Sequence, residues 1–205
     1  MSHSVNMGMQ RLVDTGLPLS VSVMFACPWY QEAVEILKRH PAVSVGIHLT
    51  LNSEWKHYRW GPVVGREAAP TLVDADGYFF QSAEALYKNH PDVREIEKEL
   101  RAQIERALRS GLKIDYVDAH MGTATRYPEF RDVTERLARE FAVGMSEYFG
   151  ETIDAPQYWA APRQKADSLV AMIDRLQPGV NVVVTHVGMD DAELGALEDM
   201  NTDNP

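Results

Sequence analysis

Two spacings of apolar residues recur along the chain. Short runs rich in Val, Ile and Leu predict strands over residues 19–25, 43–51, 114–117, 142–145 and 180–185. Longer segments whose apolar residues lie three or four positions apart predict helices over residues 4–15, 28–40, 91–110, 128–140 and 161–176. Strands that alternate with helices are typical of a largely parallel sheet covered by helices. The pattern therefore predicts an α/β fold.

A long segment without a clear period, residues 52–81, interrupts this alternation. It contains several aromatic residues and the turn formers Pro62, Gly65, Pro70 and Gly77, and its last part, residues 71–80, predicts a small hairpin. Loops of this length are uncommon unless they carry function. We therefore expect one domain, residues 1–205, with a loop and hairpin insertion at about 52–81.

The predicted elements fall short of a complete (β/α) barrel. The chain begins with a helix rather than a strand, and it has fewer strands than the roughly eight of a closed barrel. Either the sheet is open, or an N-terminal strand and one or more C-terminal units are absent from this chain. An open sheet edge can pair with a second copy, so a homodimer is one expected assembly. Residues 199–205 are polar and predict no element.

Composition and charge exclude several classes of protein. The 205 residues include 30 acids and 20 bases, a net charge of −10, which argues against a nucleic-acid partner because such binding needs clustered Lys and Arg. Cys27 is the only cysteine, so an internal disulfide is excluded, and we expect it in the core. No apolar run approaches the roughly 18 residues of a membrane span, and no signal peptide precedes the first helix. We expect no membrane partner and a cytoplasmic location.

Three of the seven histidines, His48, His120 and His186, lie at or near the carboxyl ends of predicted strands. Ligands bind at that edge of α/β sheets, so the three imidazoles form a candidate metal or acid–base cluster. Asp118 lies two residues before His120, where a carboxylate can bind a metal or orient a ligand histidine. The alternative is that these side chains only fill or cap the edge of the sheet.

An aromatic cluster after the His48 strand is a second candidate surface, formed by Trp55, Tyr58, Arg59 and Trp60. Flat rings pack against the apolar faces of sugars, so this loop is predicted to bind carbohydrate. The alternative is that its tryptophans anchor the long loop on the domain. The sequence has no Gly-x-Ser-x-Gly elbow, phosphate loop or dinucleotide fingerprint, so serine hydrolase, NTPase and Rossmann enzymes have no support.

Three segments resemble signatures of the YdjC-like (ChbG/HpnK) carbohydrate deacetylases. Residues 45–51 resemble the family's Gly-x-His-Leu-Thr-Leu signature, residues 118–122 are similar to its Asp-x-His motif, and residues 183–188 look like a third motif that ends a strand in His. The order and spacing fit across nearly the whole chain. The resemblance implies a (β/α) barrel-like fold of about seven strands, incomplete in this chain.

The resemblance also implies an activity: a metal-dependent hydrolase that removes an acetyl group from an N-acetylated amino sugar or oligosaccharide. A divalent metal, Zn or Mg, would be held by an aspartate and two histidines, which are His48 and His120 here. His186 would lie on the substrate side as a proton donor or orienting group. Two alternatives remain open, a non-catalytic carbohydrate-binding protein and another metal hydrolase, such as an amidase or a phosphoesterase.

The chain departs from the family pattern at three places. The family's Asp-Asp pair, one metal ligand and one base, would lie upstream of Met1, and Tyr116 and Gly122 stand where many members carry histidine. Asp118 is then the only nearby carboxylate that could compensate in catalysis. We therefore expect weak or no activity from this chain and a substrate contact that differs from other members.

Overall fold

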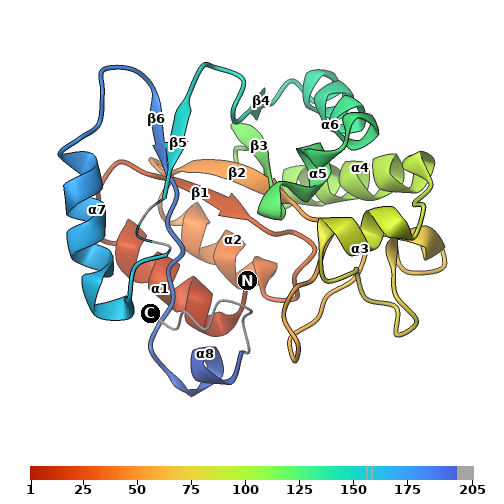
Figure 1. Cartoon of the computed structure of the whole chain (residues 1–205), viewed down its shortest axis with the longest axis horizontal. Coiled ribbons are helices and arrows are strands. Elements are labelled where there is room, and N and C mark those ends of the chain that lie inside the picture. Colours follow the sequence, from red (N-terminus) through yellow and green to blue (C-terminus); the bar gives the residue numbers. More distant parts are fainter. Residues whose placement is uncertain (156, 158, 198–205) are drawn as a thin grey trace.

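The main sheet is parallel throughout. A computed structural model describes residues 1–155, 157 and 159–197. Four strands, β1 (Ser20–Val23), β2 (Ser44–Leu49), β3 (Tyr116–Ala119) and β4 (Gly144–Met145), lie side by side in chain order (Figure 1). Because every pair is parallel, the carboxyl ends of all four strands meet at one edge of the sheet.

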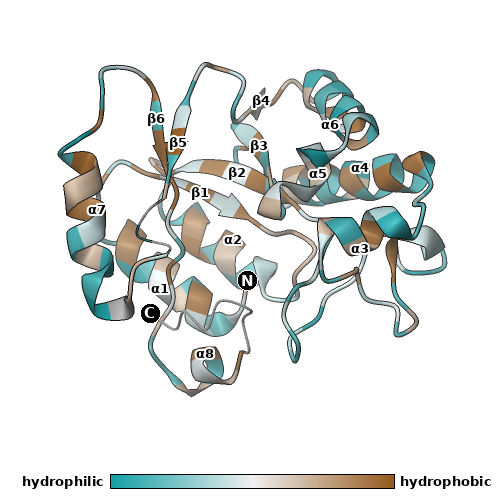
Figure 2. Cartoon of the chain, viewed as in Figure 1, coloured by the Kyte–Doolittle hydropathy of each residue, from teal (hydrophilic) through white to brown (hydrophobic). Residues whose placement is uncertain are grey.

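One helix precedes the first strand and three lie in the connections between strands, and each buries one face. They are α1 (His3–Val13), α2 (Tyr30–Lys38), α4 (Val93–Arg109) and α6 (Pro128–Glu140). In α4, Ile96, Leu100 and Ile104 lie three or four positions apart and are fully buried. Figure 2 shows the same division into hydrophobic and hydrophilic faces along these helices. The amphipathic pattern read from the sequence is therefore the pattern that packs the core.

A second sheet follows the first and is built of β5 (Thr152–Asp154) and β6 (Asn181–Val183), which are also parallel. Between and after them lie η4 (Pro162–Gln164), α7 (Lys165–Ile173) and α8 (Ala192–Ala196). This part docks on the start of the chain: Met189 N donates to Ser4 O at 3.0 Å, and the Ser4 hydroxyl donates to Asp191 and Glu193. The two ends of the described chain therefore lie together (Figure 1).

The segment after β2 is an ordered loop that packs over α4. It contains η1 (Pro70–Leu72) and, of the predicted hairpin, a single antiparallel bridge between Val73 and Phe79. Arg59 donates to the Phe79 carbonyl and to the Asp74 carboxylate, which ties the two ends of the loop together. The insertion at 52–81 is therefore structured, although it has little regular secondary structure.

One buried carboxylate fixes this loop to the helix beneath it. Glu99 of α4 has no exposed surface, and it accepts hydrogen bonds from the backbone amides of Val63 at 2.9 Å and Val64 at 3.1 Å. The Gln103 amide donates to Glu99 and to the Thr50 carbonyl, and its oxygen accepts from the Thr50 amide. The chain that follows β2 is thus held by polar groups that have no access to water.

The structure confirms the α/β class with parallel strands and corrects several details. The described strands form sheets of four and two strands, which is consistent with the expected barrel-like fold, and they do not show a closed barrel. The strand expected at 114–117 begins at Tyr116, and the short elements α3 (Ala83–Lys88), η2 (His120–Gly122), α5 (Thr123–Arg126), β5 and α8 were not predicted, because none is long enough to show a full apolar period. The expectation for residues 199–205 lies outside the described residues. The single-domain organisation stays a prediction.

No helix among the described residues has both the length and the hydrophobicity needed to cross a bilayer. Cys27 is fully buried, as expected for a core residue.

Candidate active site

The carboxyl ends of β2 and β3 place His48 beside Asp118. The two residues lie directly opposite each other in the strand register, so their side chains point to the same face of the sheet. His48 Nδ1 lies 2.7 Å from Asp118 Oδ1. An ionised carboxylate can only accept a hydrogen bond, so a neutral ring in this position donates Nδ1–H and has its lone pair on Nε2.

Asp118 is itself held from β1 and β3. Ser22 Oγ donates to Asp118 Oδ2 at 2.6 Å and lies 2.8 Å from the Tyr116 hydroxyl. Burial raises the pKa of Tyr116 to about 12, so the phenol stays protonated and can donate to Ser22. The Tyr116 ring lies against Gly46, where an added Cβ would be 2.3 Å from it. Both oxygens of Asp118 are therefore engaged, and the carboxylate is fixed in the position that orients His48.

A second carboxylate–imidazole pair lies next to the first. His120, directly after β3, has its Nε2 2.9 Å from Glu54 Oε2, and its ring centroid is 5.1 Å from that of His48. Glu54 comes from the loop after β2, where the Asn52 amide donates to the same oxygen at 3.2 Å. Thr123 Oγ1 donates to Asn52 Oδ1 at 2.7 Å, which links this loop to the turn that carries His120.

Burial decides the protonation of this second pair. The side chains of His120 and Glu54 are only 12% and 10% exposed. Burial lowers the pKa of His120 below its usual 6.5, so the ring is neutral at pH 7 and donates Nε2–H. Burial is the largest influence on Glu54 and opposes its ionisation, but the hydrogen bond from His120 and the smaller electrostatic and backbone contributions together outweigh burial, and the pKa of Glu54 falls below its usual 4.5. The pair is thus a neutral imidazole on a carboxylate.

A left-handed turn presents His120 at the end of its strand. Met121 has φ 50° and Gly122 has φ 69°, so two consecutive residues adopt a conformation that disfavours side chains. The Met121 sulfur lies 3.1 Å from the Asn52 amide nitrogen. The turn reverses the chain into α5 immediately after the histidine.

Substitution of Gly122 by alanine is expected to lower the free energy of unfolding by about 1 kcal/mol, because alanine is strained at a positive φ. A Cβ at Gly122 would meet no atom within 4 Å, so the effect is purely conformational. The matched control is Gly195→Ala in α8, which is equally free of contacts but helical, and it is expected to be neutral or stabilising. Urea unfolding of both variants measures the difference, and equal effects would contradict the argument.

A family model described as "YdjC-like protein" matches residues 1–205, the whole chain. The chain belongs to the YdjC-like protein family. Curated relatives named carbohydrate deacetylase include the following two. The protein of Brevibacillus brevis is 32% identical over 142 residues, 69% of this chain and 53% of that protein. The protein of Oceanobacillus iheyensis is 29% identical over 187 residues, 87% of this chain and 77% of that protein.

A solved structure has the same YdjC-like fold. A crystal structure from Enterococcus faecalis V583, provisionally described as that of a cellobiose-phosphate cleavage protein, superposes with a TM-score of 0.78 at 22% identity and covers 96% of this chain and 80% of that chain. The match of this YdjC-like chain to the Brevibacillus protein spans only about half of that relative's length.

The two imidazoles of this YdjC-like chain fit two positions of a divalent-cation site. In each ring one nitrogen is hydrogen-bonded to a carboxylate. The other nitrogen, Nε2 of His48 and Nδ1 of His120, is then the one that can bind a metal ion. Carboxylates orient metal-bound histidines in this way. Within residues 1–155, 157 and 159–197, no group of three or more His, Cys, Asp or Glu side chains converges as a metal centre. His48 and His120 would therefore supply at most two protein ligands to a metal ion, one fewer than a catalytic zinc site uses.

The structure brings together three of the sequence-predicted site residues, His48, His120 and Asp118, and adds one that was missed. Glu54 was not among the predicted site residues. The sequence signal that could have found Glu54 is its position, because it is an acidic residue shortly after the strand that carries His48. Nothing in the spacing of residues shows that the loop brings Glu54 back to His120. His186 lies after β6, on the other sheet, and is exposed.

The aromatic cluster is engaged in contacts with protein. Trp60 is 3% exposed and its indole N–H donates to the Asn52 carbonyl, while Tyr58 donates to the Met1 carbonyl. Trp55 lies edge-on to Trp60 at a centroid distance of 5.7 Å. These contacts are those of a loop anchor, and the substrate-binding role of Trp55, Tyr58, Arg59 and Trp60 stays a prediction.

Proposed function

We propose that this chain is the catalytic part of a hydrolase that removes acetyl groups from N-acetylated amino sugars or their oligomers. Two carboxylate–imidazole pairs at the carboxyl ends of adjacent parallel strands support this proposal, because amide hydrolysis needs groups that take up and deliver protons. The names of the relatives, carbohydrate deacetylase, give the substrate class.

We assign Glu54 as the general base, the carboxylate that takes a proton from the attacking water. It is ionised, since its pKa lies below 4.5, and it is shielded from bulk solvent, so it can accept a proton without competition from water. Both of its described hydrogen bonds go to Oε2. Asp118, whose two oxygens are engaged by His48 and Ser22, acts as a positioning residue in this scheme rather than as the base.

His48 and His120 would hold a divalent cation, Zn or Mg, which when bound polarises the acetyl carbonyl. The chain's own residues do the rest: Asp118 fixes the tautomer of His48, and Glu54 fixes that of His120. We retain His186 as the proposed donor to the leaving amine, and the loop residues Trp55, Tyr58, Arg59 and Trp60 as proposed sugar contacts.

Acetate release tests the proposal directly. Purified chain, with and without added Zn²⁺ or Mg²⁺, is incubated with N-acetylglucosamine and its β-1,4-linked dimer, and the double variant His48→Ala, His120→Ala is the control. Because the family's Asp-Asp pair is absent from this chain, we expect at most slow release of acetate from the wild-type chain, and none above background from the variant. Sugar binding without acetate release, preserved in the variant and in chelator, would instead support a non-catalytic carbohydrate-binding protein. Turnover of simple amides alone would support a different hydrolase.

A further inference from the structure

Met121 combines a strained backbone with an exposed thioether side chain beside the candidate active site. It follows His120 directly and has φ 50°. It is 51% exposed, more than any other methionine in the part of the chain that the structure describes, whereas Met9, Met145 and Met172 are buried. Strain of this kind persists only where the surrounding structure holds it, and it is concentrated at functional sites. The thioether is thus presented next to a histidine of the site.

The Met121 sulfur belongs to the hydrogen-bond network that holds Glu54. The Asn52 side-chain amide has two N–H groups, and its nitrogen lies 3.1 Å from Met121 Sδ and 3.2 Å from Glu54 Oε2. Thr123 Oγ1 donates to the amide oxygen at 2.7 Å, so both polar atoms of this fully buried side chain are engaged. A chemical change at the sulfur therefore acts on a donor of Glu54.

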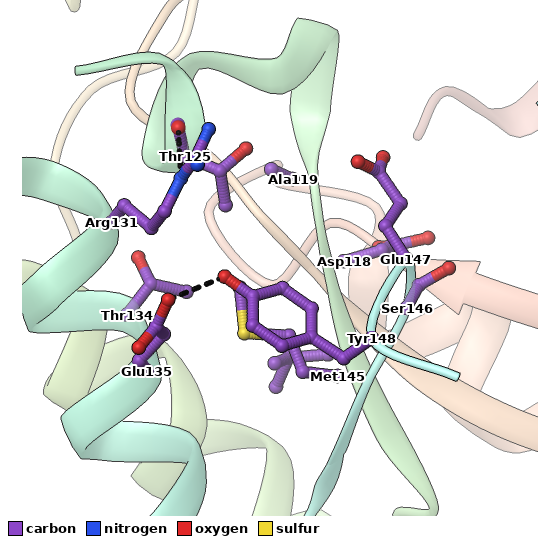
Figure 3. A pocket seen from close by; sticks show the side chains of 11 residues that line it. Asp118, Ala119, Thr125, Arg131, Thr134, Glu135, Met145, Ser146, Glu147 and Tyr148 are labelled. Carbon is purple, nitrogen blue, oxygen red and sulfur yellow. Dashed lines mark hydrogen bonds between the residues drawn. The ribbon is translucent and has the colours of Figure 1, made fainter. Parts of the chain in front are cut away.

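Open space adjoins the turn that carries Met121. Figure 3 shows Ala119, just before the turn, and Thr125, just after it, on the wall of a cavity of about 340 Å³, and the Tyr148 ring lies over the same cavity. The turn is therefore not enclosed in the core. A small solute such as a peroxide can reach it, and a larger side chain has room there.

Oxidation is the characteristic reaction of an accessible thioether. A sulfur lone pair takes one oxygen atom from hydrogen peroxide, the O–O bond breaks and water leaves, so the sulfur is oxidised by two electrons and the peroxide is reduced. The one thiol of the chain does not compete. Cys27 is fully buried, and burial raises the pKa of its thiol, which leaves little reactive thiolate.

We propose that Met121 is a peroxide-sensitive control point of this site, where oxidation to the sulfoxide draws the Asn52 amide away from Glu54 and slows hydrolysis. A thioether accepts hydrogen bonds weakly, whereas a sulfoxide is polar, and the amide nitrogen already lies in contact with the sulfur. Glu54 keeps the hydrogen bond from His120 but loses the one from Asn52. The effect on the rate rests on the proposed function, and the effect on Asn52 does not.

Peptide mass mapping and NMR test the modification without turnover. In the wild-type chain treated with hydrogen peroxide, Met121 is expected to gain oxygen at least about tenfold faster than the buried Met145. The side-chain amide signals of Asn52 are expected to shift with the same time course and to return after treatment with a methionine sulfoxide reductase. Equal oxidation of Met145 and Met121, or unshifted Asn52 signals in the oxidised protein, would overturn the proposal.

Two leucine variants separate Met121 from the other methionines. Met121→Leu keeps the approximate size of the side chain but cannot take up oxygen. Met189→Leu is the matched control, because Met189 is also partly exposed and its sulfur lies 3.9 Å from Arg11 Nη1. Each protein is its own reference: the rate of acetate release after peroxide is divided by the rate before it.

This ratio is expected to fall about tenfold in the wild-type chain and in Met189→Leu, because a hydrogen bond to a charged group is worth about that factor. In Met121→Leu it is expected to stay within about twofold. No fall in the wild-type chain, or an equal fall in Met121→Leu, would overturn the control of hydrolysis. A chain that releases no acetate before treatment contradicts the proposed function instead, and the mass and NMR results then decide this proposal alone.

Discussion

Replacement of Glu54 by glutamine is expected to slow acetate release from the N-acetylated dimer at least about 100-fold, because loss of a positioned proton acceptor costs that much or more. Glutamine keeps the shape of the side chain and an oxygen for the His120 N–H, so the local hydrogen bond can survive. The change therefore removes the ability to take a proton and little else. The rate is measured by acetate release under saturating substrate.

A charge-matched control lies in the same loop. Glu67 is 93% exposed and makes only a 4.0 Å contact with Arg66, so Glu67→Gln is expected to leave the rate unchanged. Thermal unfolding of both variants shows whether either has lost its fold. A folded Glu54→Gln protein that keeps more than about a fifth of the wild-type rate would rule out Glu54 as the base and return that role to Asp118.

Replacement of Glu99 by alanine is expected to lower the free energy of unfolding by about 3 kcal/mol. The variant removes the acceptor of three N–H groups that are buried or partly buried, the amides of Val63 and Val64 and one N–H of Gln103, whose other hydrogen bond, to the Thr50 carbonyl, remains; each such loss costs about 1 kcal/mol or more. Urea unfolding measures the difference. The matched control on the same helix is Glu97→Ala, whose ion pairs with Arg101 and Arg136 are exposed and are worth under about 1 kcal/mol.

The pH dependence of Glu99 has a definite sign. Burial raises the pKa of its carboxyl above 4.5, so the folded state binds this proton more tightly than the unfolded state does. The contribution to stability is fully present below pH 4.5 and is lost as the pH rises through the folded-state pKa. The free energy of unfolding of the wild-type chain, relative to that of Glu99→Gln, is therefore expected to fall as the pH is raised from about 4.5. An opposite slope would contradict the assignment.

The strands of the main sheet were predicted well because the spacing of apolar residues within an element depends only on the local sequence. The strand that carries His48 and the helix α6 were found close to their observed bounds, since each has a full pattern and a clear stop. The sequence also placed His48, His120 and Asp118 at one edge of the sheet, because carboxyl ends of parallel strands meet there, but it did not predict that Asp118 bonds to His48. Contacts that depend only on the order of the strands could therefore be predicted from the sequence.

Contacts that depend on the path of a loop could not be predicted from the sequence. Glu54 reaches His120 because residues 52–81 fold back on α4. That path is set by Glu99 and Gln103, which lie about two and three helical turns inside α4. Tyr148 lies over its cavity because Glu151 captures two backbone amides across a tight turn. Both are side-chain-to-backbone contacts without a sequence period, so no spacing rule detects them.

The docking of the second sheet on α1 has a consequence for the order of folding. Ser4 N donates to the Glu193 carboxylate across 189 residues of sequence, whereas the four main strands pair only with the strand before or after them in the chain. Because the entropy lost on closing a loop rises with its length, contacts of such separation form late. The main sheet is therefore expected to assemble first, and the amides at the start of α1 to gain protection from hydrogen exchange only when residues 188–193 arrive.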